Sequence, residues 1–214
     1  ALAWRPRGAP AFGCPRGMLA QTLANTSLIR GELGEARRYA DEARRSEQAP
    51  ASPFNFALAD AIEAALHLRQ GRLRQARLSL QQAAGASADK PVSGSRNVYS
   101  GVLLAEVLYE CGDEQAAQQL LELCVPPVQQ LGLPDHLIIA HSLLARIVFD
   151  RGDASRATDQ LQALEDLGRR LSLPRVIASA RLERARLLLC SGELAAAQRQ
   201  LQKASDPKLW QRVA

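Results

Sequence analysis

The chain has few aromatic residues, since only 4% of its 214 residues are Phe, Trp or Tyr. β-Sandwiches rely on aromatic and β-branched side chains, whereas alanine and leucine suffice for close-packed helices. The sequence also lacks an apolar run near the roughly 20 residues that a membrane-spanning helix needs. Residues 1–14 do not have the charged-then-apolar order of a signal peptide. These absences favour a helical, cytoplasmic domain, and the missing initial Met is compatible with a fragment of a longer protein.

Motifs of common catalytic and cofactor sites are missing as well. The sequence contains no glycine-rich phosphate loop, no His-Glu-x-x-His zinc motif and no Gly-x-Ser-x-Gly nucleophile turn. Two of the three histidines, His136 and His141, share one expected helix, but their spacing places the imidazoles poorly for one metal. We therefore expect no enzymatic activity, no cofactor and no metal site.

Cysteine and lysine are scarce. The four cysteines include no Cys-x-x-Cys pair, so we expect Cys111, Cys124 and Cys190 to be buried free thiols, and Cys14 to be exposed. The net charge of +5 comes from arginines that are mixed with acids along the chain. Because no basic stripe with interleaved aromatics occurs, we expect no direct contact with nucleic acid.

Against these absences, one pattern stands out: five short segments repeat at a nearly constant spacing. Each starts with a glycine and has an alanine five residues later, and the glycines are Gly31, Gly71, Gly112, Gly152 and Gly192. A period of 40 or 41 residues marks stacked supersecondary units. Counted from the glycine, small or apolar residues recur at offsets −7, −3, +5, +9 and +12, which follow the steps of one helix face. The glycine itself is expected at a tight turn between two helices.

The pattern predicts an all-α, right-handed α-solenoid of about five antiparallel helix pairs. Prolines stand eighteen residues before three of the glycines, where a proline suits the first turn of a helix. The expected helices are 17–30, 33–48, 54–70, 73–84, 97–111, 114–131, 135–151, 154–172, 175–191 and 193–205.

The solenoid is expected to cover residues 17–205, between an irregular N-terminal segment (1–16) and a C-terminal extension (206–214). Two apolar residues in that extension, Leu209 and Trp210, suggest two alternatives. They either cover the last helix pair, because the ends of a solenoid need a cap, or they mediate a homo-oligomer.

The order of small residue, glycine turn, alanine at +5 and large apolar residue at +9 resembles the tetratricopeptide repeat (TPR), although the period is longer. Units of about 40 residues that open with Leu133-Pro134 or Leu173-Pro174 and close with runs such as 185–192 are similar to another array. That array is the helical-repeat region of MalT-like bacterial transcription regulators, the large ATP-binding branch of the LuxR type. The resemblance covers about residues 17–205.

In that family the array lies between an N-terminal nucleotide-binding module and a C-terminal helix-turn-helix. It receives inducers or regulatory partners. Neither flanking module occurs in this sequence, so the resemblance implies a signal-sensing or protein-interaction segment rather than a whole regulator.

In TPR arrays the first helix of each pair lines the binding groove, and offsets −13, −6 and −2 would point into it. The candidate binding residues are Tyr99, Glu106, Arg146, Asp150 and Arg186. Guanidinium groups hold a carboxylate or a phosphate through two parallel hydrogen bonds. We therefore expect an inducer or a regulatory protein or peptide with such a group. The alternative is that Glu106 pairs with Arg146 and that the groove carries ordinary surface charge.

Two classes of function stay open. The first is the sensor segment of a LuxR-type regulator, and the second is a free-standing TPR-like adaptor that docks peptides or partner helices. The Lys/Asn set with which chaperone-binding TPR domains hold a C-terminal carboxylate is not reproduced, because only Asn25 matches.

Overall fold

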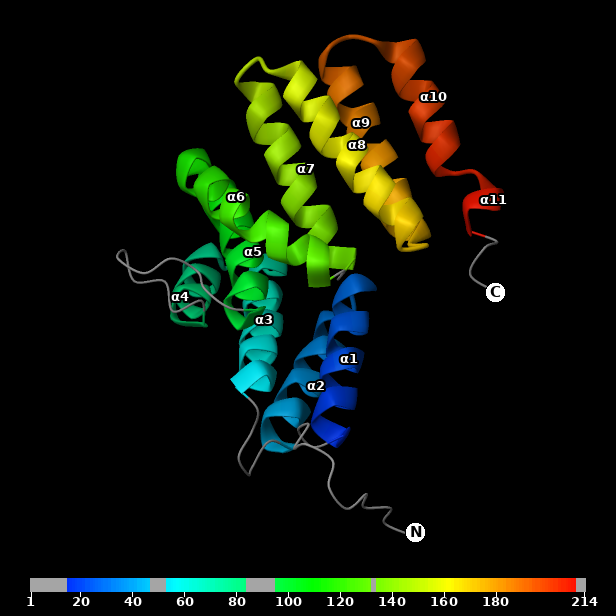
Figure 1. Cartoon of the computed structure of the whole chain (residues 1–214). Helices are drawn as coiled ribbons and strands as arrows, with labels where there is room; N and C mark the ends of the chain where they lie inside the picture. The colour runs from blue at the N-terminus through cyan, green and yellow to red at the C-terminus, as the bar shows by residue number, and fades with distance from the viewer. Residues whose placement is uncertain (1–14, 47–52, 84–94, 132–133, 211–214) are drawn as a thin grey trace. The chain divides into compact units, whose positions relative to one another are not determined.

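The computed structural model describes residues 15–46, 53–83, 95–131 and 134–210, and within these ranges every regular element is a helix (Figure 1). The chain divides into two compact units, Ala1–Ser100 and Gly101–Ala214. The boundary between them falls inside helix α5 (Ser95–Glu110). The expected all-helical, TPR-like architecture is thus confirmed.

The first unit contains α1 (Pro15–Ile29), α2 (Leu33–Ser46), α3 (Pro53–Arg69), α4 (Leu73–Ala83) and the start of α5. Helix α1 packs against α2 and α3, and α3 packs against α4. Small and large apolar side chains alternate in the core, which includes Ala24, Leu28, Ala36, Ala40, Ile62 and Leu66.

The second unit contains the rest of α5, α6 (Glu114–Leu131), α7 (Pro134–Asp150), α8 (Ala154–Arg170), α9 (Pro174–Cys190), α10 (Leu194–Ala204) and the short α11 (Pro207–Trp210). Helices α6 to α10 each contact their neighbours in chain order, α7 also contacts α9 directly, and α11 contacts α9. Figure 1 shows α7 with α8, and α9 with α10, as antiparallel hairpins. One core cluster consists of Ala145, Val148, Ala157, Leu161 and Leu187.

All five repeat glycines lie at the turns where they were expected. Their φ angles lie between +71° and +88°, a left-handed conformation that strains residues with a Cβ. At Gly152, for example, the glycine N–H donates to the Phe149 carbonyl (2.8 Å) and the next N–H donates to the Val148 carbonyl (3.0 Å). These two hydrogen bonds end the first helix of the pair and satisfy its last carbonyls.

The two alanine columns also lie where the pattern placed them. The alanines at offsets −7 and +5 are at most 1% exposed in every unit, which lets neighbouring helices approach closely. Three of the leucines at +9 are fully buried, but Leu201 in the last pair is 41% exposed. At offset −3, Leu189 is 50% exposed, so that column is not core throughout.

The cysteine prediction is correct for one residue and wrong for two. Cys124 is fully buried on α6, and this burial raises the pKa of its thiol to about 11. Cys111 and Cys190 are exposed because each lies at the end of a first helix, next to the glycine turn. Cys14 lies outside the described residues.

The contact between α8 and α9 is tight at one point. A Cβ built on Gly168 would lie 2.8 Å from Ile177 Cγ1, 3.0 Å from the Ile177 nitrogen and 3.2 Å from Val176 Cβ. A glycine is therefore required there by space and not by backbone conformation.

Helix α1 begins two residues before the expected start of the solenoid, and α11 lies within the expected extension. The three-part division of the chain stays a prediction. None of the helices in the described ranges is long and apolar enough to cross a membrane, and the cytoplasmic location also stays a prediction.

Candidate functional site

The charged residues at offset −6 of three successive units lie on α5, α7 and α9, and all belong to the second unit. These three helices line a hollow of about 250 Å³, which we call the furrow. The residues that line it include Glu106, Leu143, Arg146, Ser179, Leu182 and Glu183. The furrow thus combines apolar walls with a small set of charged groups.

At the centre of the furrow, Arg146 on α7 meets Glu183 on α9. The two side chains form parallel hydrogen bonds, from Nε to Oε1 (2.7 Å) and from Nη2 to Oε2 (2.6 Å). The Glu183 side chain is only 9% exposed and that of Arg146 is 27% exposed. A bidentate pair of this kind fixes the orientation of the guanidinium plane.

Glu183 also binds a second arginine. Arg186, one turn further along α9, donates from Nη1 to Glu183 Oε1 (3.1 Å), and half of its side chain remains exposed. One buried carboxylate therefore orients two guanidinium groups, one of which faces solvent.

The charged residues around Glu183 change the pKa values of their neighbours. The hydrogen bond that Arg146 donates to Glu183 holds the pKa of Arg146 above its ordinary value, against the opposing effect of burial. Burial raises the pKa of Tyr109 on α5, and the charges of Arg146, Asp150 and Arg186 also act on its phenol.

The structure brings together three of the five predicted residues. Glu106 and Arg146 line the same hollow, and Arg186 shares Glu183 with Arg146, whereas Asp150, the last residue of α7, is not among the residues that line the hollow.

The fifth residue, Tyr99, was expected to rim the furrow, and this is wrong. Tyr99 is only 4% exposed and stands between buried residues at the start of α5, next to Val98 and Ser100. Its ring belongs to the core, where burial raises the pKa of its phenol. An enclosed ring of this kind cannot border a solvent-filled groove.

Sequence reasoning missed Glu183 and Tyr109. Glu183 stands at offset −9, where the three preceding units have Ile62, Leu103 and Leu143, so the column suggests a core position. The signal that identifies it is the change from apolar to acidic in a helix that also carries several arginines. Tyr109 stands at offset −3 and was assigned to the core for the same reason.

The arrangement is suited to recognition. Arginine is a donor that keeps its proton in proteins, so Arg146 and Arg186 supply charge and hydrogen bonds but no acid–base catalysis. Within the parts of the chain that the structure describes, no three His, Cys, Asp or Glu side chains are placed to hold a metal ion.

Comparisons with known proteins agree with this description. Of the solved structures, BtubC (BKLC) from P. vanneervenii aligns with a TM-score of 0.62 at 16% identity, over 93% of this chain and 83% of that one. A tetratricopeptide repeat protein from Parabacteroides merdae aligns with a TM-score of 0.38 at 14% identity, over 92% of this chain and 97% of that one. At such identities the first likeness shows the fold alone. No curated protein sequence matches the chain.

The sequence model of the MalT-like TPR region matches residues 14–212, which is nearly the whole chain. The helix pairs, the glycine turns and this match agree on one assignment. The chain belongs to the MalT-like TPR family.

Proposed function

We propose that this chain is the sensing and protein-interaction segment of a LuxR-type transcription regulator, and that it binds an inducer or a regulatory partner in the furrow. The observation that carries the proposal is the carboxylate of Glu183, which lines the furrow and binds both Arg146 and Arg186.

The chemistry of the furrow defines the kind of ligand. The half-exposed side chain of Arg186 is available to a carboxylate or a phosphate, and Arg146, which binds the same Glu183, lines the furrow. Leu143 and Leu182 provide an apolar wall, and Leu182 is 48% exposed. A ligand with one acidic group and an adjoining apolar part satisfies both features.

A signal would pass from this site through the relative placement of α7 and α9. A ligand that contacts Arg146 on one helix and Arg186 on the next stabilises the arrangement in which both can bind it. It shifts the population of states only by its difference in affinity between them. In the proposed regulator this shift exposes or hides a surface for oligomerisation.

The test is calorimetric titration of the 214-residue chain with short acidic peptides, dicarboxylates and sugar phosphates. The double variant Arg146→Ala/Arg186→Ala is expected to lose about tenfold or more in affinity for a binding probe, since hydrogen bonds to charged groups are lost. The matched control is Arg156→Ala/Arg199→Ala, which removes the same charge from exposed positions on α8 and α10. Equal affinity of the furrow variant and the wild type for the probe would show that the furrow is not the binding site.

A second candidate, the free-standing adaptor, is favoured by the exposed Leu182 beside the charged group, because a partner helix offers both apolar and acidic side chains. The parent reading frame discriminates between the two. A phosphate loop before Ala1 and a helix-turn-helix after Ala214 support the regulator, whereas a natural chain that ends near both residues supports the adaptor.

A further inference from the structure

A second charged cluster lies in the same unit, on the side of α9 that faces α8 and α10. Its centre is Glu165 on α8, whose side chain is only 4% exposed. Three arginines donate to this carboxylate: Arg169 (2.6 Å), Arg181 (2.9 Å) and Arg184 (2.8 Å). They are held in place by one buried acid.

The cluster has more donors than its acids can accept. Three guanidinium groups carry about fifteen N–H bonds, whereas one carboxylate accepts about four. Arg169 also donates to Asp166 (2.8 Å), and Arg181 donates to the Lys203 carbonyl (2.7 Å). With Lys203 and Asp206 included, four basic side chains face three acidic ones.

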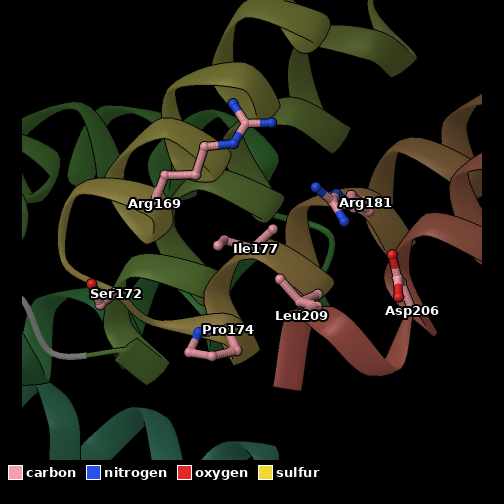
Figure 2. Close-up of a pocket in the computed structure, with 7 residues that line it drawn as sticks. All are labelled: Arg169, Ser172, Pro174, Ile177, Arg181, Asp206 and Leu209. Atoms are coloured by element: carbon pink, nitrogen blue, oxygen red, sulfur yellow. The ribbon is translucent and has the colours of Figure 1, made fainter. Parts of the chain in front are cut away.

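This cluster borders open space on two sides. One hollow of about 540 Å³ is lined by Arg181, Arg184 and Lys203, and a second of about 480 Å³ is lined by Pro174, Ile177 and Leu209. The two hollows share Arg169, Arg181 and Asp206. Figure 2 shows the Arg169 and Arg181 guanidinium groups above Ile177, with Pro174 and Leu209 below it.

We propose that this arginine pocket, formed by Arg169, Arg181, Pro174, Ile177 and Leu209, binds a small amphiphilic anion. The carboxylate or phosphate of the ligand is bound by the two arginines, and its short aliphatic or aromatic body lies on the apolar residues. Glu165 preorganises the guanidinium groups, so little side-chain freedom is lost when the anion binds. The pocket is separate from the furrow, because its residues come from α8, α11 and the other side of α9.

The experiment titrates the ¹⁵N-labelled 214-residue chain by NMR with four probes at low salt. Hexanoate and hexyl phosphate carry both the acidic group and the apolar body, whereas hexanol lacks the charge and inorganic phosphate lacks the body. We expect one or both amphiphilic anions to bind saturably, at least about tenfold more tightly than the two partial probes, with shifts at Arg169, Ile177 and Leu209. The stronger of the two identifies the preferred acidic group.

Three variants complete the test. Arg169→Ala, at a half-exposed side chain, is expected to weaken binding about tenfold, while Arg199→Ala on the exposed surface of α10 leaves it unchanged. The furrow variant Arg146→Ala/Arg186→Ala is expected to bind as the wild type does. Binding of hexanol or inorganic phosphate as tight as that of the amphiphiles, no saturable binding, or full binding by Arg169→Ala would each overturn the proposal.

Discussion

Two buried glutamates of the second unit each accept hydrogen bonds from several arginines, but they connect different helices. Glu165 joins α8 to α9 through Arg181 and Arg184, and it also binds Arg169 on its own helix. Arg181 also donates to the backbone carbonyl of Lys203, in the last turn of α10. Glu183 joins α7 to α9 through one bidentate pair with Arg146 and adds the half-exposed Arg186.

The two clusters differ in which helices their arginines bind. Around Glu165 the arginines bind side chains and backbone of three helices, so their first role is to hold α8, α9 and α10 together. Around Glu183, Arg146 connects the two first helices α7 and α9 beside the furrow, while Arg186 extends from the same helix as Glu183. Similar clusters of one acid and several arginines therefore hold different sets of helices together, and each borders a hollow that we propose as a binding site.

The largest effect expected is that of removing the charge of Glu165. Glu165→Gln leaves three clustered guanidinium groups without their acid, and breaking a buried ion pair of this kind costs about 3–5 kcal/mol of unfolding free energy. Glu183→Gln affects two arginines instead of three, and neither is as buried as Arg181 or Arg184, so we expect about 1–3 kcal/mol. Urea unfolding measures both. An equal cost for the two variants would contradict the distinction between the clusters.

A smaller effect is expected from acid. Burial raises the pKa of Glu165, but the hydrogen bonds from Arg184 and Arg181 and the charge of Arg169 outweigh it, so the net pKa lies below its ordinary value. Because the unfolded carboxyl takes up its proton first, the native state loses stability as the pH falls below about 4.3. We expect a steeper loss between pH 5 and pH 3 for the wild type than for Glu165→Gln.

His136 provides an internal reference for that experiment. Burial lowers the pKa of its imidazole to about 4, so both proteins also lose stability as the pH falls from 6.5 to about 4. The difference between wild type and Glu165→Gln cancels this shared loss. Parallel curves below pH 4.3 would show that Glu165 contributes no pH dependence.

Next in size is the effect of adding a methyl group at Gly168, three residues after Glu165. The new Cβ would press on the Ile177 backbone and side chain, and we expect Gly168→Ala to cost about 1–3 kcal/mol. Gly34→Ala is the matched control, because that helical glycine has open space around its Cβ position. It should be neutral or slightly stabilising. Thermal unfolding distinguishes the two variants. An unchanged stability of Gly168→Ala would show that α8 and α9 can move apart to make room for the added methyl group.

The smallest effect is expected for Arg186→Ala. Its side chain is half exposed, so its pair with Glu183 contributes at most about 1 kcal/mol to stability. Arg156→Ala, which removes an exposed pair with Glu122, should cost about the same. In chemical unfolding the two variants should coincide, and only Arg186→Ala should weaken ligand binding. A large loss of stability for Arg186→Ala would make it a structural residue.

The repeat pattern was sufficient to predict the helix pairs, because its signals are local. A glycine with positive φ, an alanine column and a proline in the first turn each depend on a few neighbouring residues. The predicted helix ends accordingly lie within about two residues of those in the structure.

The site was less predictable, because its partners come from different helices. Glu183 breaks an apolar column, and only the packing of α7 against α9 shows that it binds Arg146. The arginine cluster around Glu165 was not predicted for the same reason. Column positions alone also suggested that Tyr99 faces the groove, although it is buried.

The five glycine turns have a further consequence. Since all of them hold φ between +71° and +88° and share one hydrogen-bonding pattern, the joint within a helix pair is interchangeable between units. A pair could be duplicated or deleted without altering the joint of any other pair. Gene duplication could therefore lengthen such an array while the side chains at offsets −6 and −2 diverge.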